Sequence, residues 1–434
     1  MVFYFSAFGR RTKQRTFPFF SIRFVSKKKS VAIVGAGPAA LSLAARLRED
    51  LFDITLYEGQ AAPARKLLVA GDGGLNLTHS EALEAFITRY SPPSFLEKCL
   101  RFFPPAALCD WLQEIGIETY VGSSKRVFPE PQVKPIQVLQ AIVQQLQDKG
   151  VQIKTRHLWK GWKEDGSLWF HYKETELAVK ADLVVFALGG ASWGKTGSNG
   201  TWAPLFENKG IHVLPFEASN CAYEVRWESG FLSLAEGKWL KNIAVSCGHF
   251  TKEGELVITR SGLEGGALYA LSPQIRTQWK QKGHADLFFD LKPMFSLEEV
   301  VAKCSLPNRK SQQHLLREKL RFSEVHITLL KTLLSKEEFT DPARLAQKIK
   351  RLPIRLLGPG PIGEAISTVG GIPLGEVSEN FEFIKLPEHY AIGEMLDWDA
   401  PTGGYLLQGC FSMGAYLASV LNGKDPLGIH IHAT

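Results

Sequence analysis

Residues 35–40, with the sequence GAGPAA, constrain the fold of this chain more than any other feature. They follow an apolar run at 31–34 and open a helical pattern with apolar residues at 40, 43, 44 and 47. A second apolar run at 54–57 comes next and ends at Glu58. This order of strand, glycine-rich turn, helix and strand predicts a βαβ unit whose turn binds a dinucleotide.

Each small residue of the turn has a predicted task. Gly35 permits the tight turn, Gly37 lets the backbone approach a pyrophosphate, and Ala40 lets the helix pack close to the strand. Free N–H groups and the positive end of the helix dipole would meet the phosphate charge. Glu58 stands where a carboxylate accepts hydrogen bonds from ribose hydroxyls, which disfavours the alternative of a glycine-rich turn without a nucleotide.

A second match to G-x-G-x-x-G occurs at residues 358–363 and serves as an internal control. Pro359 and Pro361 remove two of the N–H donors that a phosphate needs, and the glycines of 368–371 follow in place of a helix. We interpret this segment as a loop, so it does not predict a separate NAD(P)H domain.

Two further segments favour FAD over NAD as the resident cofactor. Residues 65–68 and a glycine-rich turn lead to Asn76, so Lys66 could pair with a flavin phosphate or ring oxygen and Asn76 with the ring edge. Near the other end, Asp397 precedes Gly403 and Gly404, whose N–H groups could reach an anionic flavin edge at a helix start. A helix cap or surface carboxylate is an equally good interpretation of Asp397 by itself.

Composition narrows the class of protein without naming its substrate. The formal charge of +7 comes from eight Lys and Arg in residues 1–30, and without them 43 basic residues face 44 acidic ones. That basic segment is either a disordered extension or an organellar transit peptide, and we expect a cytoplasmic protein without a membrane span. The six cysteines form no C-x-x-C pair, which disfavours a redox disulfide and a zinc site, and no metal is expected.

The remaining pattern alternates between helices and strands and changes in the middle of the chain. Helices are predicted at 105–116 and 135–150, strands at 151–155 and 183–188, and a hairpin at 168–179. From about 205 to 345, β-like segments at 243–247 and 255–259 surround a predicted turn at 252–254, and Ser296 with Glu299 forms a capping box before charged helices. A last strand at 390–392 and a helix from 403 to 421 would complete the first domain.

These motifs, together with Val127-Phe128-Pro129, residues 187–190, residues 195–198 and residues 368–371, resemble the bacterial BaiN/RdsA (YhiN-like) family of NAD(P)/FAD-dependent oxidoreductases. The resemblance implies an α/β fold: a glutathione-reductase-type Rossmann FAD-binding domain with an inserted β-plus-helical domain. The implied domains are a basic tail at 1–29, a discontinuous FAD-binding domain at 30–195 and 350–430, and an insert at 196–349. Gly74-Leu75 stands where many members have Arg-Cys, so this chain belongs to a distinct subgroup.

The implied function is FAD-dependent oxidation or reduction of a small organic substrate, with NAD(P)H as a transient electron donor. A nucleic-acid-modifying flavoprotein and a non-catalytic flavin scaffold are the alternatives, although no stable nucleic-acid partner is expected. No residue stands out as a catalytic base. The candidate cofactor contacts are Gly35, Ala36, Gly37, Pro38, Ala39, Ala40, Glu58, Lys66, Asn76, Gly189, Asp397, Gly403, Gly404, Tyr405 and Gln408.

Overall fold

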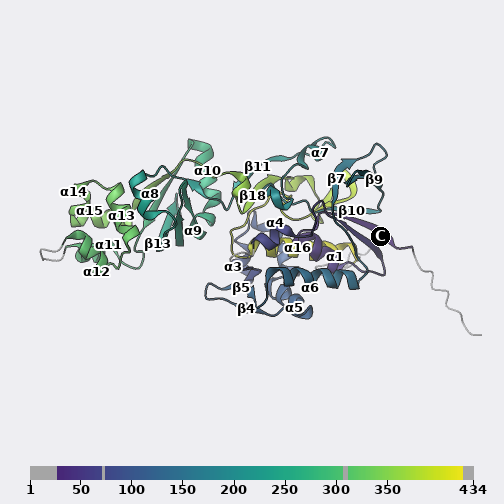
Figure 1. The fold of residues 1–434 in the computed structure, drawn as a ribbon, viewed down its shortest axis with the longest axis horizontal. Helices are drawn as coiled ribbons and strands as arrows, with labels where there is room; N and C mark the ends of the chain where they lie inside the picture. Colours follow the sequence, from purple (N-terminus) through teal and green to yellow (C-terminus); the bar gives the residue numbers. More distant parts are fainter. Residues whose placement is uncertain (1–26, 71–73, 306–310, 424–434) are drawn as a thin grey trace, which may run out of the picture.

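The computed structural model describes residues 27–70, 74–305 and 311–423, which form two lobes side by side along the long axis (Figure 1). Most of the predicted basic tail, the last residues of the predicted domain and the glycine-rich turn at 71–73 therefore lie outside the described residues. Lys29, the last residue of the predicted tail, is instead the first residue of strand β1, because its N–H donates to the carbonyl of Leu51.

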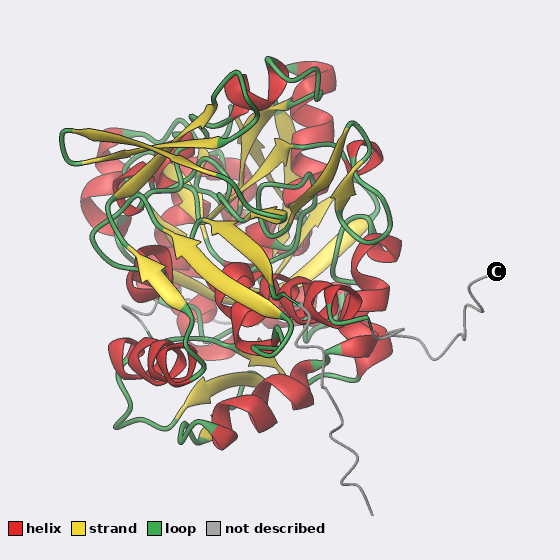
Figure 2. Cartoon of the chain, turned by 90° about the vertical axis from the view of Figure 1, so that its right-hand side faces the viewer, coloured by secondary structure: helices red, strands yellow, loops and turns green. Residues whose placement is uncertain are grey.

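The first lobe, called the cofactor lobe below, is built on a six-stranded sheet with the order β19-β20-β10-β1-β2-β6. All neighbouring pairs are parallel except β19 with β20. Helices lie on both sides of these strands (Figure 2), which explains why the central strands are continuous apolar runs. The strands are β1 (Lys29–Val34), β2 (Phe52–Tyr57), β6 (Gln152–Lys154), β10 (Leu183–Phe186), β19 (Glu382–Phe383) and β20 (Leu386–Ala391).

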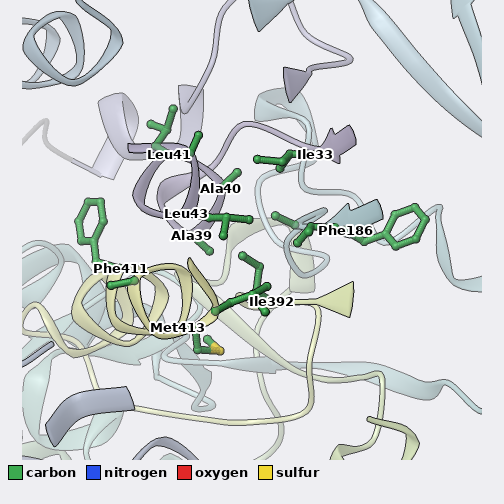
Figure 3. Packing of buried hydrophobic residues seen from close by; sticks show 14 of the residues in the cluster. Ile33, Ala39, Ala40, Leu41, Leu43, Phe186, Ile392, Phe411 and Met413 are labelled. Carbon is green, nitrogen blue, oxygen red and sulfur yellow. The ribbon is translucent and has the colours of Figure 1, made fainter. Parts of the chain in front are cut away.

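The two ends of the described chain meet where helix α1 (Pro38–Arg46) packs on helix α16 (Tyr405–Leu421), as Figure 3 shows. Gly414 makes the close approach possible, since a Cβ built on it would lie 2.2 Å from the carbonyl oxygen of Ala39. The Ser42 hydroxyl donates to the carbonyl of Phe411 at 2.7 Å in the same seam. The last helix of the described chain thus packs on the first one, and β20 pairs with β10, while the predicted limits of the discontinuous domain stay a prediction.

Smaller elements surround this core. One three-stranded sheet has the order β3-β5-β4. A second one is the meander β7-β8-β9, which contains the predicted hairpin as β8 and β9 and leads into β10. The other elements of this lobe are α2 (Arg65–Ala70), β3 (Thr78–His79), α3 (Leu83–Ile87), α4 (Pro93–Phe102), α5 (Pro105–Glu114), β4 (Thr119–Val121), β5 (Arg126–Pro129), α6 (Pro135–Asp148), β7 (His157–Trp162), β8 (Leu168–Tyr172), β9 (Thr175–Val179), η1 (Gly194–Thr196), α7 (Ala203–Glu207) and η3 (Leu374–Glu376).

The second lobe, called the insert lobe, contains a six-stranded antiparallel sheet with the order β12-β15-β14-β13-β16-β17 and a cluster of helices at its far end (Figure 1). Its elements are β12 (Tyr223–Glu224), α8 (Ser229–Ala235), β13 (Trp239–Cys247), β14 (Phe250–Ile258), β15 (Gly262–Glu264), α9 (Gly266–Tyr269), α10 (Ser272–Lys282), β16 (Ala285–Asp290), α11 (Leu297–Cys304), α12 (Gln312–Lys319), α13 (Glu324–Leu333), α14 (Lys336–Thr340), α15 (Pro342–Lys350), β17 (Leu352–Leu356) and η2 (Ile362–Glu364).

Two predictions for this lobe have different outcomes. The capping box is confirmed, because the Ser296 hydroxyl accepts from the N–H of Glu299 and the Glu299 carboxylate accepts from the N–H of Ser296. The turn predicted at 252–254 is wrong, since Lys252 and Gly254 lie inside β14 and pair with β13. The chain turns at Gly248, whose φ of +60° suits glycine, and the polar residues after it continue the strand.

Buried apolar side chains form two clusters, one in each lobe. Trp202, Phe206 and Val213 belong to the cofactor-lobe cluster, whereas the buried residues of β17 belong to the insert cluster, which extends from Ala218 to Ala365. The predicted insert limits at 196 and 349 stay a prediction. Limits drawn from the insert cluster would instead lie at about 218 and 365. The segments β11 (Leu214–Ser219) and β18 (Ser367–Gly371) pair antiparallel between the lobes.

The helical end of the insert lobe carries a pH-sensitive group. His326 is buried, and burial lowers its pKa from 6.5 to about 4, so folding favours its neutral form. A histidine with a lowered pKa stabilises the fold above pH 6.5, and this contribution is lost as the pH falls from 6.5 toward 4. We expect the free energy of unfolding to fall by about 2 kcal/mol more in the wild type than in His326→Gln between pH 8 and pH 5. Urea unfolding at both pH values checks this, and equal losses in the two proteins would contradict it.

Candidate cofactor groove and interlobe cleft

The turn between β1 and α1 has the geometry that a bound phosphate needs. Gly35 has a φ of +99°, and a Cβ on it would lie 2.4 Å from the carbonyl oxygen of Ala187, so only glycine fits there. Gly37 caps α1, and a Cβ on it would meet no atom within 4 Å. Because the first backbone N–H groups of a helix have no partner within the helix, they are available to a ligand in this open space.

Glu58 lies directly after β2 and beside the turn. Its carboxylate accepts hydrogen bonds from the N–H of Ala36 at 3.0 Å and the N–H of Gln60 at 2.7 Å. Burial raises the pKa of Glu58 above its usual value, while these two hydrogen bonds act in the opposite direction. The carboxylate is thus held in place at the groove, with the acceptor chemistry that a ribose diol requires.

Lys66 is paired with an acid that the sequence analysis did not select. Its Nζ donates to Glu394 Oε2 at 2.9 Å and to the Ser192 hydroxyl at 2.8 Å. Glu394 also accepts from the N–H of Thr368 at 3.1 Å through its other oxygen. Since both charged side chains are mostly buried, Lys66 reaches the groove as half of an ion pair.

These residues line a groove of about 310 Å³ along the carboxyl ends of the parallel strands. In an open α/β sheet this edge is where ligands bind. Ala40 is fully buried behind the turn, as its predicted packing role requires. The predicted contacts that line the groove are Gly35, Ala36, Gly37, Pro38, Ala39, Glu58, Lys66 and Gly189.

The other predicted contacts lie elsewhere. Asp397 accepts a hydrogen bond from the N–H of Gly370 at 2.9 Å. It thereby holds the last residues of β18, the strand through which the chain returns from the insert lobe. Gln408 is fully buried and donates to the carbonyl of Phe103 at 2.9 Å. Gly404, with a φ of +91°, lies against Thr78, and a Cβ on it would be 2.5 Å from the Thr78 Cα. Their contacts with a flavin stay a prediction.

The arrangement fits FAD on observations of the chain itself. The Oδ1 atom of Asn76 and the Oε1 atom of Gln408 are buried without a hydrogen-bond partner among the described residues, and such atoms call for a ligand or water. Open space at Gly37, the Glu58 carboxylate and the glycines before α16 are the predicted places for pyrophosphate, ribose and ring. The predicted contacts that line the groove, with Asn76 and Gly403, would hold the cofactor.

A much larger cleft of about 1540 Å³ lies between the two lobes. Its cofactor-lobe wall includes Gly403 and Tyr405 at the start of α16, so the predicted ring site faces this cleft. Its other wall combines the exposed apolar side chains of Trp239, Phe250 and Met294 with charged residues of β14, among them Lys252 and Glu253. A substrate in the cleft would therefore lie between this mixed wall and the polar wall of the cofactor lobe.

The polar wall contains a connected group of side chains. The Tyr405 hydroxyl donates to Glu81 at 2.5 Å, and Arg89 donates to both Glu81 oxygens, at 3.0 and 2.7 Å. Burial and the hydrogen bond with Glu81 raise the pKa of Tyr405, so its proton stays on the phenol at neutral pH. His79 stacks on the Tyr405 ring, and burial lowers its pKa.

Sequence reasoning missed Glu394 and Cys410 among the groove residues, and it missed Ser192 as a partner of Lys66. Glu394 could have been found, because it follows a strand of the parallel sheet almost directly, as Glu58 does. Ser192 and Cys410 carried no signal. Burial raises the pKa of Cys410 to about 12, so it remains a thiol and not a nucleophilic thiolate.

A cofactor groove at the carboxyl edge of a parallel sheet, opposite a second lobe, defines the class: the protein is an FAD-dependent oxidoreductase on a Rossmann fold. Its sequence matches the family described as HI0933-like protein Rossmann domain over residues 29–420, and the chain belongs to that family. The resemblance inferred from the motifs and the predicted fold class are both confirmed.

Curated relatives cover nearly the whole chain at low identity. A ribosomal RNA dihydrouridine synthase of Haemophilus influenzae is 24% identical over 392 residues, which are 88% of this chain and 95% of the relative. A 3-dehydro-bile acid delta(4,6)-reductase of Clostridium scindens is 22% identical over 415 residues, 91% of this chain and 99% of the relative. Among solved structures, a 3-ketosteroid delta1-dehydrogenase of Sterolibacterium denitrificans is 12% identical, with a TM-score of 0.49 over 92% of this chain and all of that one.

Two further observations concern ligands and membranes. None of the helices in the described part of the chain combines the length and the apolar character that crossing a bilayer requires. Within the same residues, no group of three or more His, Cys, Asp or Glu side chains is placed to hold a metal ion.

Proposed function

We propose that the protein is an FAD-dependent reductase that adds two hydrogens to a carbon–carbon double bond conjugated to a carbonyl group. Its substrate is a small organic molecule held in the interlobe cleft, and NAD(P)H is the transient electron donor. The observation that carries the proposal is the position of the cleft, which borders the start of α16 on one side and the insert lobe on the other.

The chemistry in the names of the relatives supports the choice of reaction. Dihydrouridine differs from uridine by two hydrogens on a double bond next to a carbonyl, and a delta(4,6)-reductase is named for reducing double bonds. The two named substrates differ greatly in size, but both names describe hydrogen added to a double bond. The proposal therefore takes from these relatives the type of reaction and not either substrate.

The residues of the chain would bind and orient the reactants. FAD, held by the groove residues, would supply the capacity for hydride transfer between the donor and the substrate. The apolar side chains of Trp239, Phe250 and Met294 would exclude water from one face of the substrate. On the other face, Arg126 lines the cleft beside Gly403 and forms no ion pair among the described residues, so its N–H donors can bind the substrate carbonyl.

A pair of matched probes tests the reaction. The purified protein should show a flavin absorption band that bleaches with NADPH or NADH under anaerobic conditions. The reduced protein should then be reoxidised by 2-cyclohexen-1-one but not by cyclohexanone, which has the carbonyl without the double bond. A protein that binds no FAD, or reduced flavin that both ketones leave unchanged, would count against the proposal.

A second candidate is reduction of uridine within RNA. It is favoured by the RNA in the name of the Haemophilus influenzae relative and by the length of the cleft, whose lining residues on β14 extend from Phe250 to Val257. Seven residue steps of a strand span roughly 23 Å, which is longer than one nucleoside needs. Reoxidation of the reduced protein by poly(U) but not by poly(C), together with no reaction with 2-cyclohexen-1-one, would select this candidate.

A further inference from the structure

We infer that Arg276, Ser219 and Asp399 form a latch between the two lobes, and that this latch sets the opening of the cleft. The Arg276 guanidinium donates to Asp399 Oδ2 at 2.6 Å and to the Ser219 hydroxyl at 2.9 Å. The Ser219 hydroxyl in turn lies 2.9 Å from both oxygens of Asp399 and donates to them. The three side chains thus form a closed ring of hydrogen bonds.

Each member of the latch belongs to a different part of the molecule. Arg276 lies on α10 of the insert lobe, next to Ile275 in the core of that lobe. Asp399 lies between Trp398 and Ala400, which belong to the core of the cofactor lobe. Ser219 ends β11, one of the two strands that connect the lobes, so the ring joins both lobes and the connection between them.

The connection itself has the form of a hinge. The chain enters the insert lobe through β11 and leaves it through β18, and these two strands pair with each other. In Figure 1 both strands lie between the lobes, beside α10. A single two-stranded ribbon resists rotation weakly compared with a packed core, so the angle between the lobes depends on contacts such as the latch.

Asp399 also connects the latch to the predicted ring site. Its backbone N–H and C=O are both hydrogen-bonded to Ser91, at 2.9 and 2.8 Å, which fixes it to the cofactor lobe. Residues 399–403 line the cleft and lead directly into α16. Because Arg276 moves with the insert lobe, its bond to Asp399 fixes the distance between that lobe and this segment.

Burial gives the latch its strength. The side chains of Arg276 and Asp399 are 13% and 7% exposed, so losing one partner leaves a mostly buried charge without its counter-ion. The same helix offers a matched control one turn further on, where Lys280 pairs with Glu217 of β11. Those side chains are 57% and 34% exposed, and an exposed pair of this kind contributes little.

The test compares Arg276→Gln with Lys280→Gln in the full-length chain. Small-angle X-ray scattering reports the separation of the lobes and needs no cofactor. In protein that carries FAD, quenching of flavin fluorescence by the neutral quencher acrylamide reports access to the ring site. Removing the latch should raise an open form from about 1% to a large fraction, which increases the radius of gyration and raises the quenching constant by about twofold or more.

Lys280→Gln should match the wild type in both measurements. If Arg276→Gln does not fold, Arg276→Lys replaces it, because lysine keeps the charge but cannot bond both partners in the same way. Unchanged scattering in a folded Arg276 variant would overturn the inference. The quenching measurement rests on the proposed function. A protein that binds no FAD would contradict that function, and the scattering measurement would then test the latch by itself.

Discussion

Replacing Gly37 with alanine should weaken FAD binding by about 100-fold, or roughly 2.7 kcal/mol, without affecting the stability of the apoprotein. A Cβ at this position meets no protein atom within 4 Å and projects into the groove where the pyrophosphate is expected. Its backbone conformation is open to any residue, because φ is −79°. Titration of the apoprotein with FAD measures the affinity, and urea unfolding of the apoprotein measures the stability, which should change by less than about 0.5 kcal/mol.

Gly35→Ala is the matched comparison, because it changes the same turn for a different reason. Its Cβ would overlap the carbonyl of Ala187 at 2.4 Å, and its φ of +99° is unfavourable for alanine. We expect it to lower both FAD affinity and stability, the latter by about 2 kcal/mol or more. If Gly37→Ala binds FAD as tightly as the wild type, the groove is not the pyrophosphate site.

The βαβ unit and its turn could be predicted because their signals are local. The spacing of apolar residues fixes where β1, α1 and β2 occur, and the glycine that the positive φ at position 35 requires is present in the sequence. The loop at the second glycine-rich match was also predictable, since the chain there forms only the short η2 turn after β17. In each case the deciding residues lie within one continuous segment, 31–58 for the βαβ unit and 353–371 for the loop.

The ion pair in the groove could not be predicted in the same way. Lys66 and Glu394 are 328 positions apart, and the parallel order β20-β10-β1-β2 of the sheet brings their segments together. Asp397 is a predicted cofactor contact because of its closeness to the glycines before α16, and that contact stays a prediction. In the structure that carboxylate holds Gly370, since the chain between β20 and α16 must also fasten the connection between the lobes. The position of a carboxylate next to a glycine-rich motif therefore does not tell whether it binds the cofactor or holds a neighbouring strand.

Gly414→Ala should cost the protein about 3 kcal/mol or more of stability, at the upper end of overpacking effects. The new methyl group would lie 2.2 Å from the carbonyl oxygen of Ala39 and 2.8 Å from the N–H nitrogen of Leu43, so α1 and α16 would have to separate. Backbone atoms cannot rotate away as a flexible side chain can. The side chains of α1 and α16 around this contact are also buried and packed together (Figure 3).

The same substitution should also weaken FAD binding, because the strained seam begins at Ala39, in the first turn of the helix whose N-terminus is predicted to bind the pyrophosphate. Gly375→Ala is the control, since a Cβ there meets nothing within 4 Å, and its stability should stay within about 0.5 kcal/mol of the wild type. Urea unfolding of both variants decides the matter. Equal stability would mean that α16 does not pack on α1 as closely as the structure has it, and the cofactor lobe would then not depend on the C-terminal helix to hold the phosphate-binding turn.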